Sequence, residues 1–483
     1  MRFRRIAEVT ASMLLLAGAT RSAVAQAASQ SGNATALIRR AITAVGGEGA
    51  LRAIDGTTST MWLSRFNLGG GQWPGAPGTL LQIAGTEARD FRGERVAIRG
   101  KRFTIAGDTQ QVRIVATPDG GFERIFTYTL PYTTDTLAQR RRELHLTPAR
   151  LLLTASRARC RTGPTITRET SGRRLRSVTC STAETGEFIV RLDSAWGWPM
   201  EVERVEEGPM FGAQRVLSRY GSFTPVETAR GRALLPYVVH QFRDGRLESV
   251  TAYSRIEASL PNDSVFAVPD SLRSETFAKR PIDVRVEELA PGVHYLSSGA
   301  DYNALAVIQR DSIILLEAAE TQDRLRAMID TLARRFPQSP VRMLVSSHHH
   351  ADHMAGIPLA FARGIDVATH PDNLGWIRRM AALASQRTPR AARASRVVAV
   401  SDSLVLGRGT ATELRLYPIA LSEAATHVMG VLPQHGILYI ADTAEGDIAP
   451  DLRAEVERRG LRIRRAASAH SGMTDWSKSA ATP

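Results

Sequence analysis

The chain has 483 residues, of which 43% are hydrophobic, and a formal net charge of +14 at pH 7. This length exceeds the usual size of a single core, so we expect two or three globular domains. Nearly all of the positive charge is arginine, because only Lys101, Lys279 and Lys478 are lysines. The excess could favour anionic substrates or an anionic envelope surface, but solvated arginines are the more ordinary explanation. No alternation of aromatic and basic residues indicates nucleic acid, which we exclude as a partner.

Residues 1–25 have the features of a cleaved secretory signal. Three arginines among the first five residues precede a short apolar stretch from Met13 to Ala19, and Ala23-Val24-Ala25 supplies the small-x-small pattern of a cleavage site. No other stretch approaches the roughly 18 apolar residues of a transmembrane helix. We therefore predict a mature protein without a transmembrane segment, periplasmic or secreted, whose net charge is roughly +11 after cleavage.

Residues 26–280 are predicted to form a strand-rich N-terminal domain with an opening helix. Apolar residues at helical spacing predict a helix over residues 35–45, which Gly46-Gly47 ends. From about residue 57 to residue 259, short β-prone runs such as residues 126–130 and 188–192 alternate with Gly, Pro, Asp and Ser, a pattern typical of an antiparallel meander. Cys160 and Cys180 flank turn signals, and they predict a hairpin disulfide, with two unpaired thiols as the alternative.

The end of this region resembles the curved sheets of lipoprotein-carrier-like domains that precede enzymes in exported bacterial proteins. The resemblance rests on Tyr220-Gly-Ser-Phe, Leu235-Pro-Tyr and Phe266-Ala-Val-Pro. It implies either binding of a lipid or peptide, or a structural or docking role, and we favour the structural or docking role.

A second domain is predicted over residues 281–483, after a polar linker at Lys279-Arg280-Pro281. Strand and helix patterns alternate there. We expect strands at 292–296, 304–309, 312–316 and 341–345, and helices at 322–336 and 358–363. Residues 373–396 have the character of an insertion that could shape substrate access.

Residues 348–353 read His-His-His-Ala-Asp-His and follow the strand-like run 341–347. Imidazole and carboxylate ligands in this mixture are typical of zinc and similar cations. His348 and His350 are two positions apart and face the same way from an extended segment, while Asp352 and His353 follow where the chain curls back. The run predicts one turn that serves two neighbouring ions, with a solvated histidine-rich loop as the alternative.

From about Ile282 to Trp476 the chain resembles the metallo-β-lactamase superfamily of hydrolases. The H-x-H-x-D-H signature is complete, and Glu317 stands where the family has a strand-ending acidic residue. Asp442, after the run Ile437-Leu-Tyr-Ile-Ala, resembles the metal-bridging aspartate, and His470 resembles the last metal histidine. The resemblance implies an αββα sandwich. The whole chain is then of the α+β class, with a mainly antiparallel β domain ahead of the sandwich.

The resemblance also implies two divalent metal ions, with zinc the expected metal. The first ion would be held by His348, His350 and His427, the second by Asp352, His353 and His470, and Asp442 would bridge them. A strict alignment instead puts Glu423 in the place of the third histidine of the first ion. His427 would lie opposite Asp442 if the hairpin turns about residues 433–436, so we favour His427 and keep Glu423 as the alternative.

These residues predict an exported metal-dependent hydrolase that acts on a small-molecule ester, lactone, thioester or amide through a bridging hydroxide. Asp352 is the candidate catalytic residue, because it could orient the hydroxide and pass its proton to the leaving group. Asp442 favours the wider hydrolase group, since true β-lactamases of the superfamily generally carry another residue there. A single iron, as in persulfide-oxidising relatives, stays open. The competing prediction, motivated by Glu423, is a non-catalytic envelope binding protein with a degenerate metal site.

Overall fold

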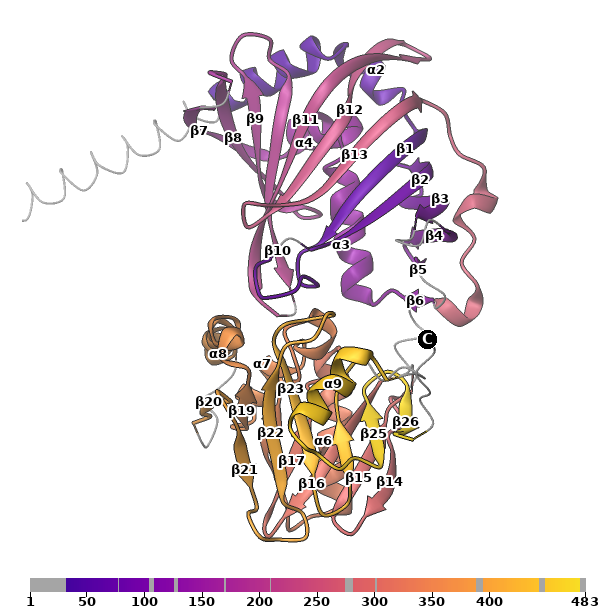
Figure 1. Ribbon diagram of the computed structural model, residues 1–483. Helices are drawn as coiled ribbons and strands as arrows, with labels where there is room; N and C mark the ends of the chain where they lie inside the picture. The colour runs from indigo at the N-terminus through magenta and orange to yellow at the C-terminus, as the bar shows by residue number, and fades with distance from the viewer. Residues whose placement is uncertain are drawn as a thin grey trace, which may run out of the picture. The chain divides into compact units, whose positions relative to one another are not determined.

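The computed structural model describes residues 32–477 except 77, 104–107, 126–128, 169–170, 209, 274–280, 300–301, 388–393 and 443–447 (Figure 1). The predicted signal, most of the predicted linker and the start of the predicted strand at 126–130 lie outside these residues. The chain divides into two compact units. The first takes in the chain through Arg65, Leu80–Glu206 and Gln214–Arg280, and the second takes in Phe66–Thr79, Glu207–Ala213 and the chain from Pro281. Two short segments of the predicted N-terminal domain thus belong to the second unit.

The first unit is built on one sheet of 13 strands in the order β6-β5-β4-β3-β2-β1-β13-β12-β11-β10-β9-β8-β7. Every strand pair with a printed register is antiparallel, and most neighbours in space are also neighbours in the chain, as a meander requires. The strands are β1 (Gly56–Asn67), β2 (Thr79–Asp90), β3 (Arg95–Phe103), β4 (Thr109–Thr117), β5 (Gly120–Arg124), β6 (Leu130–Pro131), β7 (Arg159–Thr167), β8 (Arg174–Thr182), β9 (Gly186–Asp193), β10 (Pro199–Gly208), β11 (Gly212–Thr228), β12 (Gly231–Arg243) and β13 (Arg246–Glu257).

Helices lie on both faces of this sheet, because Leu137 packs with Ile114 of β4 whereas Phe266 packs with Val115, which points to the opposite side of that strand. Residues 32–44 are helical, and the other helices of the unit are α2 (Gly47–Arg52), α3 (Thr134–His145), α4 (Pro148–Arg157), η1 (Asp263–Phe266) and η2 (Asp270–Leu272). Thr133 begins α3, because its side chain accepts the N–H of Thr136. Buried Leu151 and Leu152 of α4 pack with Val178 of β8 in the larger core of the unit. The apolar face of α4 is thus buried against the sheet.

The predicted disulfide between Cys160 and Cys180 is present, and it joins β7 to β8 where the two cysteines are paired in register. This confirms the prediction for the two cysteines of the chain.

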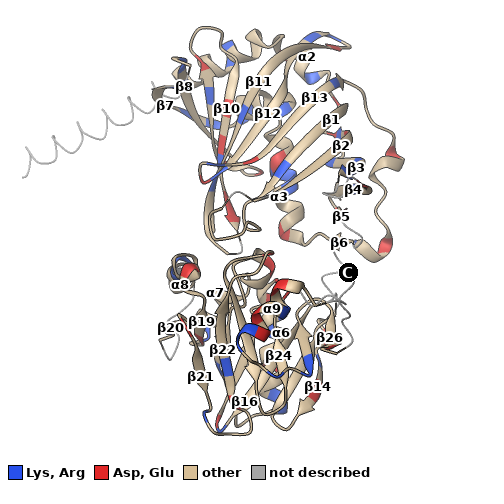
Figure 2. Cartoon of the chain, viewed as in Figure 1, with Lys and Arg blue, Asp and Glu red and all other residues tan. Residues whose placement is uncertain are grey.

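Arginines and acidic residues both occur along the strands of the same sheet (Figure 2), and several of them form ion pairs. The nearly buried Glu203 of β10 lies 2.7 Å from Arg191 on β9 and 2.7 Å from Arg215 on β11. Its neighbour on the same face, Glu201, lies 3.1 Å from Arg219. Several arginines of this unit therefore neutralise its buried carboxylates.

The second unit contains two sheets. One has seven strands in the order β14-β15-β16-β17-β18-β19-β20, and the other has six in the order β21-β22-β23-β24-β25-β26. The strands of the first are β14 (Arg285–Ala290), β15 (Val293–Ser297), β16 (Asn303–Gln309), β17 (Ser312–Leu316), β18 (Val341–Val345), β19 (Asp366–Thr369) and β20 (Val397–Ala399). The strands of the second are β21 (Leu404–Leu406), β22 (Leu414–Ile419), β23 (His427–Leu432), β24 (Ile437–Tyr439), β25 (Arg465–Ser468) and β26 (Gly472–Asp475).

The two sheets face each other, and helices pack on their outer faces. Leu305 of β16 and Leu416 of β22 share the core between the sheets. The alternate residue Ala306 faces outward and packs with Leu325 of α6 in a second core. The helices are α6 (Gln322–Arg335), α7 (Ile357–Ala362), α8 (Leu374–Arg387) and α9 (Pro450–Arg458), with η3 (Ala351–His353) and η4 (Pro371–Asn373) between them. Alternation along each strand thus produces two apolar faces per sheet, as a four-layer sandwich requires.

The strands and helices predicted between residues 292 and 363 are confirmed to within two residues at each end. The segment predicted as an insertion has a different character. Ile377, Met380 and Ala384 of α8 are buried in the same core as α7, so residues 374–387 belong to the sandwich itself. Within the described residues, no helix combines the length and the apolar character needed to cross a membrane.

Candidate metal centre

The predicted ligands lie where strands of both sheets end. In the seven-stranded sheet, β17 and β18 are parallel, and Glu317 and His348 follow their carboxyl ends. In the six-stranded sheet, β24 and β25 are parallel, and Asp442 and His470 follow theirs. Parallel strands bring their carboxyl ends to one edge, where α/β proteins bind ligands. Residues far apart in the sequence therefore meet at one place.

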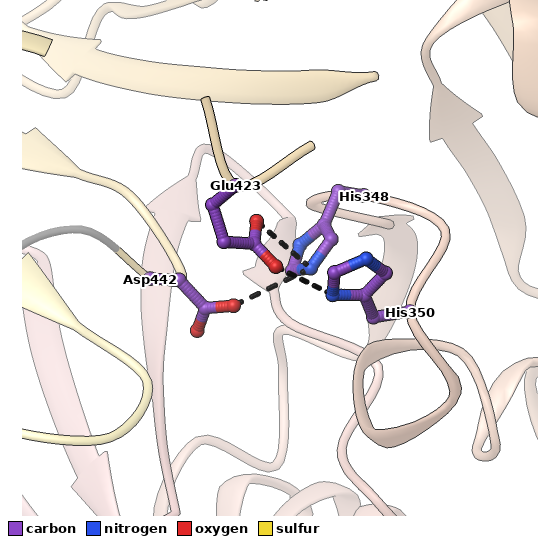
Figure 3. Close-up of side chains that lie close together, drawn as sticks. All are labelled: His348, His350, Glu423 and Asp442. Carbon is purple, nitrogen blue, oxygen red and sulfur yellow. Dashed lines mark ion pairs between the residues drawn. The ribbon is translucent and has the colours of Figure 1, made fainter. Parts of the chain in front are cut away.

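Four side chains form a first group of potential metal ligands: His348, His350, Glu423 and Asp442 (Figure 3). Each offers one ligand atom, and these atoms lie within 4.8 Å of one another. Glu423 is central, because its Oε1 lies 2.5 Å from Nδ1 of His350 and its Oε2 lies 3.6 Å from Nε2 of His348. Nε2 of His348 also lies 3.4 Å from Oδ2 of Asp442.

Asp352, His353 and His470 form a second group of the same kind. Nε2 of His353 lies 3.2 Å from Oδ2 of Asp352 and 3.2 Å from Nε2 of His470. Oδ1 of Asp442 lies 3.3 Å from each of these two imidazole nitrogens. Asp442 therefore turns one oxygen toward each group.

His427 belongs to neither group, although it is fully buried beside the first one. Its Nε2 lies 2.8 Å from Oε2 of Glu423, so the carboxylate stands between His427 and His350. The hairpin turns at residues 433–436, as predicted, because Leu432 pairs with Ile437 and Gly430 with Tyr439. Continued past β24, this register sets His427 opposite Asp442.

The residues present fit a divalent cation. Among the described residues, Nε2 of His348 and Oδ1 of Asp442 are buried without a hydrogen-bond partner. Buried polar atoms nearly always have a partner, so two unsatisfied atoms of potential ligands in adjacent groups indicate that a bound group is expected there. Imidazole nitrogens with carboxylate oxygens are donors that zinc and similar ions accept.

Strong electrostatic coupling also marks the centre. Burial lowers the pKa of His348 well below its usual value, and neighbouring imidazoles add to this effect. Burial would raise the pKa of Glu423, but the hydrogen bonds from His350 and His427 lower it to about 2. Burial would likewise lower the pKa of His353, but the carboxylates around it raise the value well above normal. Several titratable groups with raised or lowered pKa values, gathered where strands end, are typical of functional sites.

A buried shell orients the second group. Oε2 of Glu317, which is fully buried, lies 3.1 Å from Nδ1 of His353 and accepts a hydrogen bond from Ser347 at 3.0 Å. The Tyr302 hydroxyl lies 3.2 Å from the same Nδ1 and donates to the carbonyl of Asp352. A polar partner on the far nitrogen fixes the ring of a metal-ligating histidine.

Tyr302 and Asn303 are both buried and support ligand-bearing loops. Asn303 donates from its side chain to the carbonyl of Ala469 at 2.9 Å, directly before His470.

Two contacts of the first group could not be predicted from the sequence. The carbonyl of Gly71 lies 3.0 Å from Nε2 of His350. The side chain of Gln72 donates to the carbonyls of Leu421 and Ser422 at 3.1 and 3.2 Å, just before Glu423. No local signal marks Gly71 or Gln72, because they are about 280 and 350 residues from these partners.

No protein-family model matches this chain, and no curated protein sequence is significantly similar to it. The similar solved structures include three metallo-β-lactamases. One from Erythrobacter litoralis is 21% identical and covers 40% of this chain and 91% of its own, with a TM-score of 0.29. One from Pontibacter korlensis is 16% identical and covers 40% and 94%, with a TM-score of 0.30. FIM-1 from Pseudomonas aeruginosa, in a mono-zinc form, is 18% identical and covers 40% and 90%, with a TM-score of 0.30.

Proposed function

We propose that this protein is an exported metal-dependent hydrolase that binds two divalent cations, zinc being the expected metal, and acts on an ester, lactone, thioester or amide. The observation that carries the proposal is the position of Asp442. Its Oδ2 lies 3.4 Å from His348 and its Oδ1 lies 3.3 Å from His353, so one carboxylate serves two adjacent donor groups. A shared carboxylate between two groups of ligands is what a pair of neighbouring cations needs.

The first cation would be held by His348, His350 and Glu423, and the second by Asp352, His353 and His470, with Asp442 shared. Glu423 rather than His427 is proposed as the third ligand of the first group, because its carboxylate is already within 2.5 Å of His350. His427 would then act through Glu423, since its Nε2 donates to that carboxylate at 2.8 Å. Such a partner fixes the orientation of a ligating carboxylate.

Divalent cations at such a site supply Lewis acidity and generate a nucleophile from water near neutral pH. The side chains of the chain would do the remaining work. Asp352 is the most exposed carboxylate of the two groups, with 47% of its side chain accessible, so it can reach a substrate while contacting His353. We propose Asp352 as the residue that moves a proton toward the leaving group. Glu317 and Tyr302, which are buried, would hold His353 in place.

A second candidate function is a non-catalytic envelope binding protein. It is favoured by a cavity of about 340 Å³ within the first unit, bounded by α3 and the strands of the sheet. The cavity walls include apolar Met61 and Ile98 together with charged Arg89, Glu143 and Arg243. A mixed lining of this size is typical of small-molecule sites. The lipoprotein-carrier-like resemblance of this unit stays a prediction.

Metal analysis of the purified mature protein separates the two candidates. The hydrolase should contain near two divalent ions per chain, and it should cleave members of a panel of esters, lactones, thioesters and amides in a chelator-sensitive manner. His350→Ala should abolish the chelator-sensitive rate, whereas His435→Ala, in the β23–β24 turn, should leave it unchanged. One ion or none, with no hydrolysis of any panel member, would favour the binding protein.

A further inference from the structure

The stretch Asn67–Trp73 belongs to the same unit as the metal centre, although it lies far from the ligands in sequence. It leaves the end of β1 before the chain returns as β2, both of which pair in the 13-stranded sheet. The stretch itself belongs to the second unit. Asn67 folds it into a tight turn, because its carbonyl accepts the N–H of Gly70 at 3.0 Å and its side chain accepts that of Gly69 at 3.3 Å.

One side of this turn contacts the loop that carries His350. A Cβ built on Gly69 would lie 3.5 Å from Cβ of Ala351, so the turn and this loop are neighbours. The carbonyl of Gly71 lies 3.0 Å from Nε2 of His350. A carbonyl oxygen only accepts, so Nε2 carries a hydrogen, and Nδ1 is the atom that would bind a cation after giving up its own hydrogen. Nδ1 is the atom that lies 2.5 Å from Glu423.

The other side of the turn contacts the loop that carries Glu423. Gln72 donates from Nε2 to the carbonyls of Leu421 and Ser422 at 3.1 and 3.2 Å. Its own carbonyl accepts the N–H of Ala425 at 2.7 Å. Gln72 therefore makes three hydrogen bonds to the loop, two to residues before Glu423 and one to a residue after it.

We propose that Gly71 and Gln72 are positioning residues that hold the loops of His350 and Glu423 at the spacing a cation requires. This inference rests on the proposed function, because it assigns these residues to the first of the two cations. Fixing a ligand loop before binding lowers the conformational entropy lost on binding. Partners of metal ligands contribute roughly 10- to 100-fold in metal affinity.

The test uses three variants of the full chain. Gln72→Ala removes both side-chain hydrogen bonds, and Gln72→Glu keeps nearly the same shape but cannot donate to carbonyls. Gln111→Ala is the matched control, because Gln111 is an exposed glutamine on β4. The dissociation constant for cobalt(II) is measured from its visible absorption, and amide hydrogen exchange of the metal-free protein is followed in peptides that cover residues 421–428.

We expect Gln72→Ala and Gln72→Glu to weaken binding of one cobalt ion by roughly 10-fold or more. Exchange at residues 421–428 should be faster in both variants, while the unfolding midpoint and the Gln111→Ala variant remain like wild type. Wild-type affinity in Gln72→Ala, or in Gln72→Glu alone, would overturn the inference, because the donated hydrogen bonds would then be dispensable. A wild-type protein that binds no cobalt would overturn the proposed function, and this inference with it.

Discussion

Nε2 of His427 lies 2.8 Å from Oε2 of Glu423, four residues earlier in the chain, whereas His350 contacts the other oxygen, Oε1, of the same carboxylate. Glu423 and His427 were the two candidates for one ligand position in the sequence. In the structure Glu423 contacts the ligand His350, and His427 contacts Glu423. We therefore expect substitution of Glu423 and substitution of His427 to change the metal content differently.

Glu423→Ala should remove the first cation, because it deletes the atom that is within 2.5 Å of His350. The metal content should fall from near two to near one ion per chain. His427→Ala should keep both ions but weaken the first by roughly 10- to 100-fold, as expected for a partner of a ligand. Inductively coupled plasma analysis and competition with a chelator measure these quantities. Loss of an ion in His427→Ala with full content in Glu423→Ala would reverse the assignment.

Asp442→Asn should affect both cations, because one amide nitrogen replaces an oxygen that faces one of the two groups. We expect less than two ions per chain and a chelator-sensitive rate lower by on the order of 100-fold. Asp311→Asn, an exposed residue before β17, is the matched control and should keep the wild-type rate. Full metal content and full activity in Asp442→Asn would contradict the bridging role.

Much of the second unit could be predicted from the sequence, because its signals are local. The run His348-His-His-Ala-Asp-His353 follows β18, and Asp442 and His470 follow the short strands β24 and β25. The choice between Glu423 and His427 could not be made, since it depends on the path of the loop before β23. That path is fixed by Gln72, about 350 residues away in sequence from the carbonyls it contacts.

The first unit was predictable as a strand-rich meander but not as a single sheet of 13 strands. The pairing that makes it one sheet joins β1 to β13, whose residues Thr58 and Glu257 are nearly 200 positions apart. Alternating patterns identify strands, but they do not identify partners this distant.

Asp90 provides a pH-dependent test of the first unit. Burial would raise the pKa of this carboxyl, but the N–H groups of Arg92 and Gly93 and the guanidinium of Arg95 lower it. A lowered folded-state pKa contributes stability that is fully present above the ordinary aspartate value of about 4 and is lost as the pH falls through the folded-state value.

Asp90→Asn should therefore lower the free energy of unfolding by about 1–3 kcal/mol at pH 7, and by less at pH 3. Urea unfolding followed by circular dichroism at both pH values measures the difference. Asp108→Asn, an exposed residue just before β4, is the control. A difference that does not change with pH would show that the charge on Asp90 is not what stabilises the turn.

The disulfide between Cys160 and Cys180 should stabilise the first unit by about 3 kcal/mol, because it closes a loop of roughly 20 residues in the unfolded chain. Replacing both cysteines with alanine should lower the unfolding midpoint. Adding a reductant should lower the midpoint of the wild type to a similar value and leave the double variant unchanged. Equal midpoints for oxidised and reduced wild type would contradict this contribution.

The division of the chain into units has a consequence for how this protein can be cut and fused. Residues 66–79 and 207–213 lie far upstream of Pro281, yet they are part of the second unit. Phe211 packs edge-on against Trp376 of α8, with 5.0 Å between the ring centroids. A fragment that starts at residue 281 lacks Phe211 and would expose the side chain of Trp376. A gene truncated at that point should yield an aggregating or unstable product.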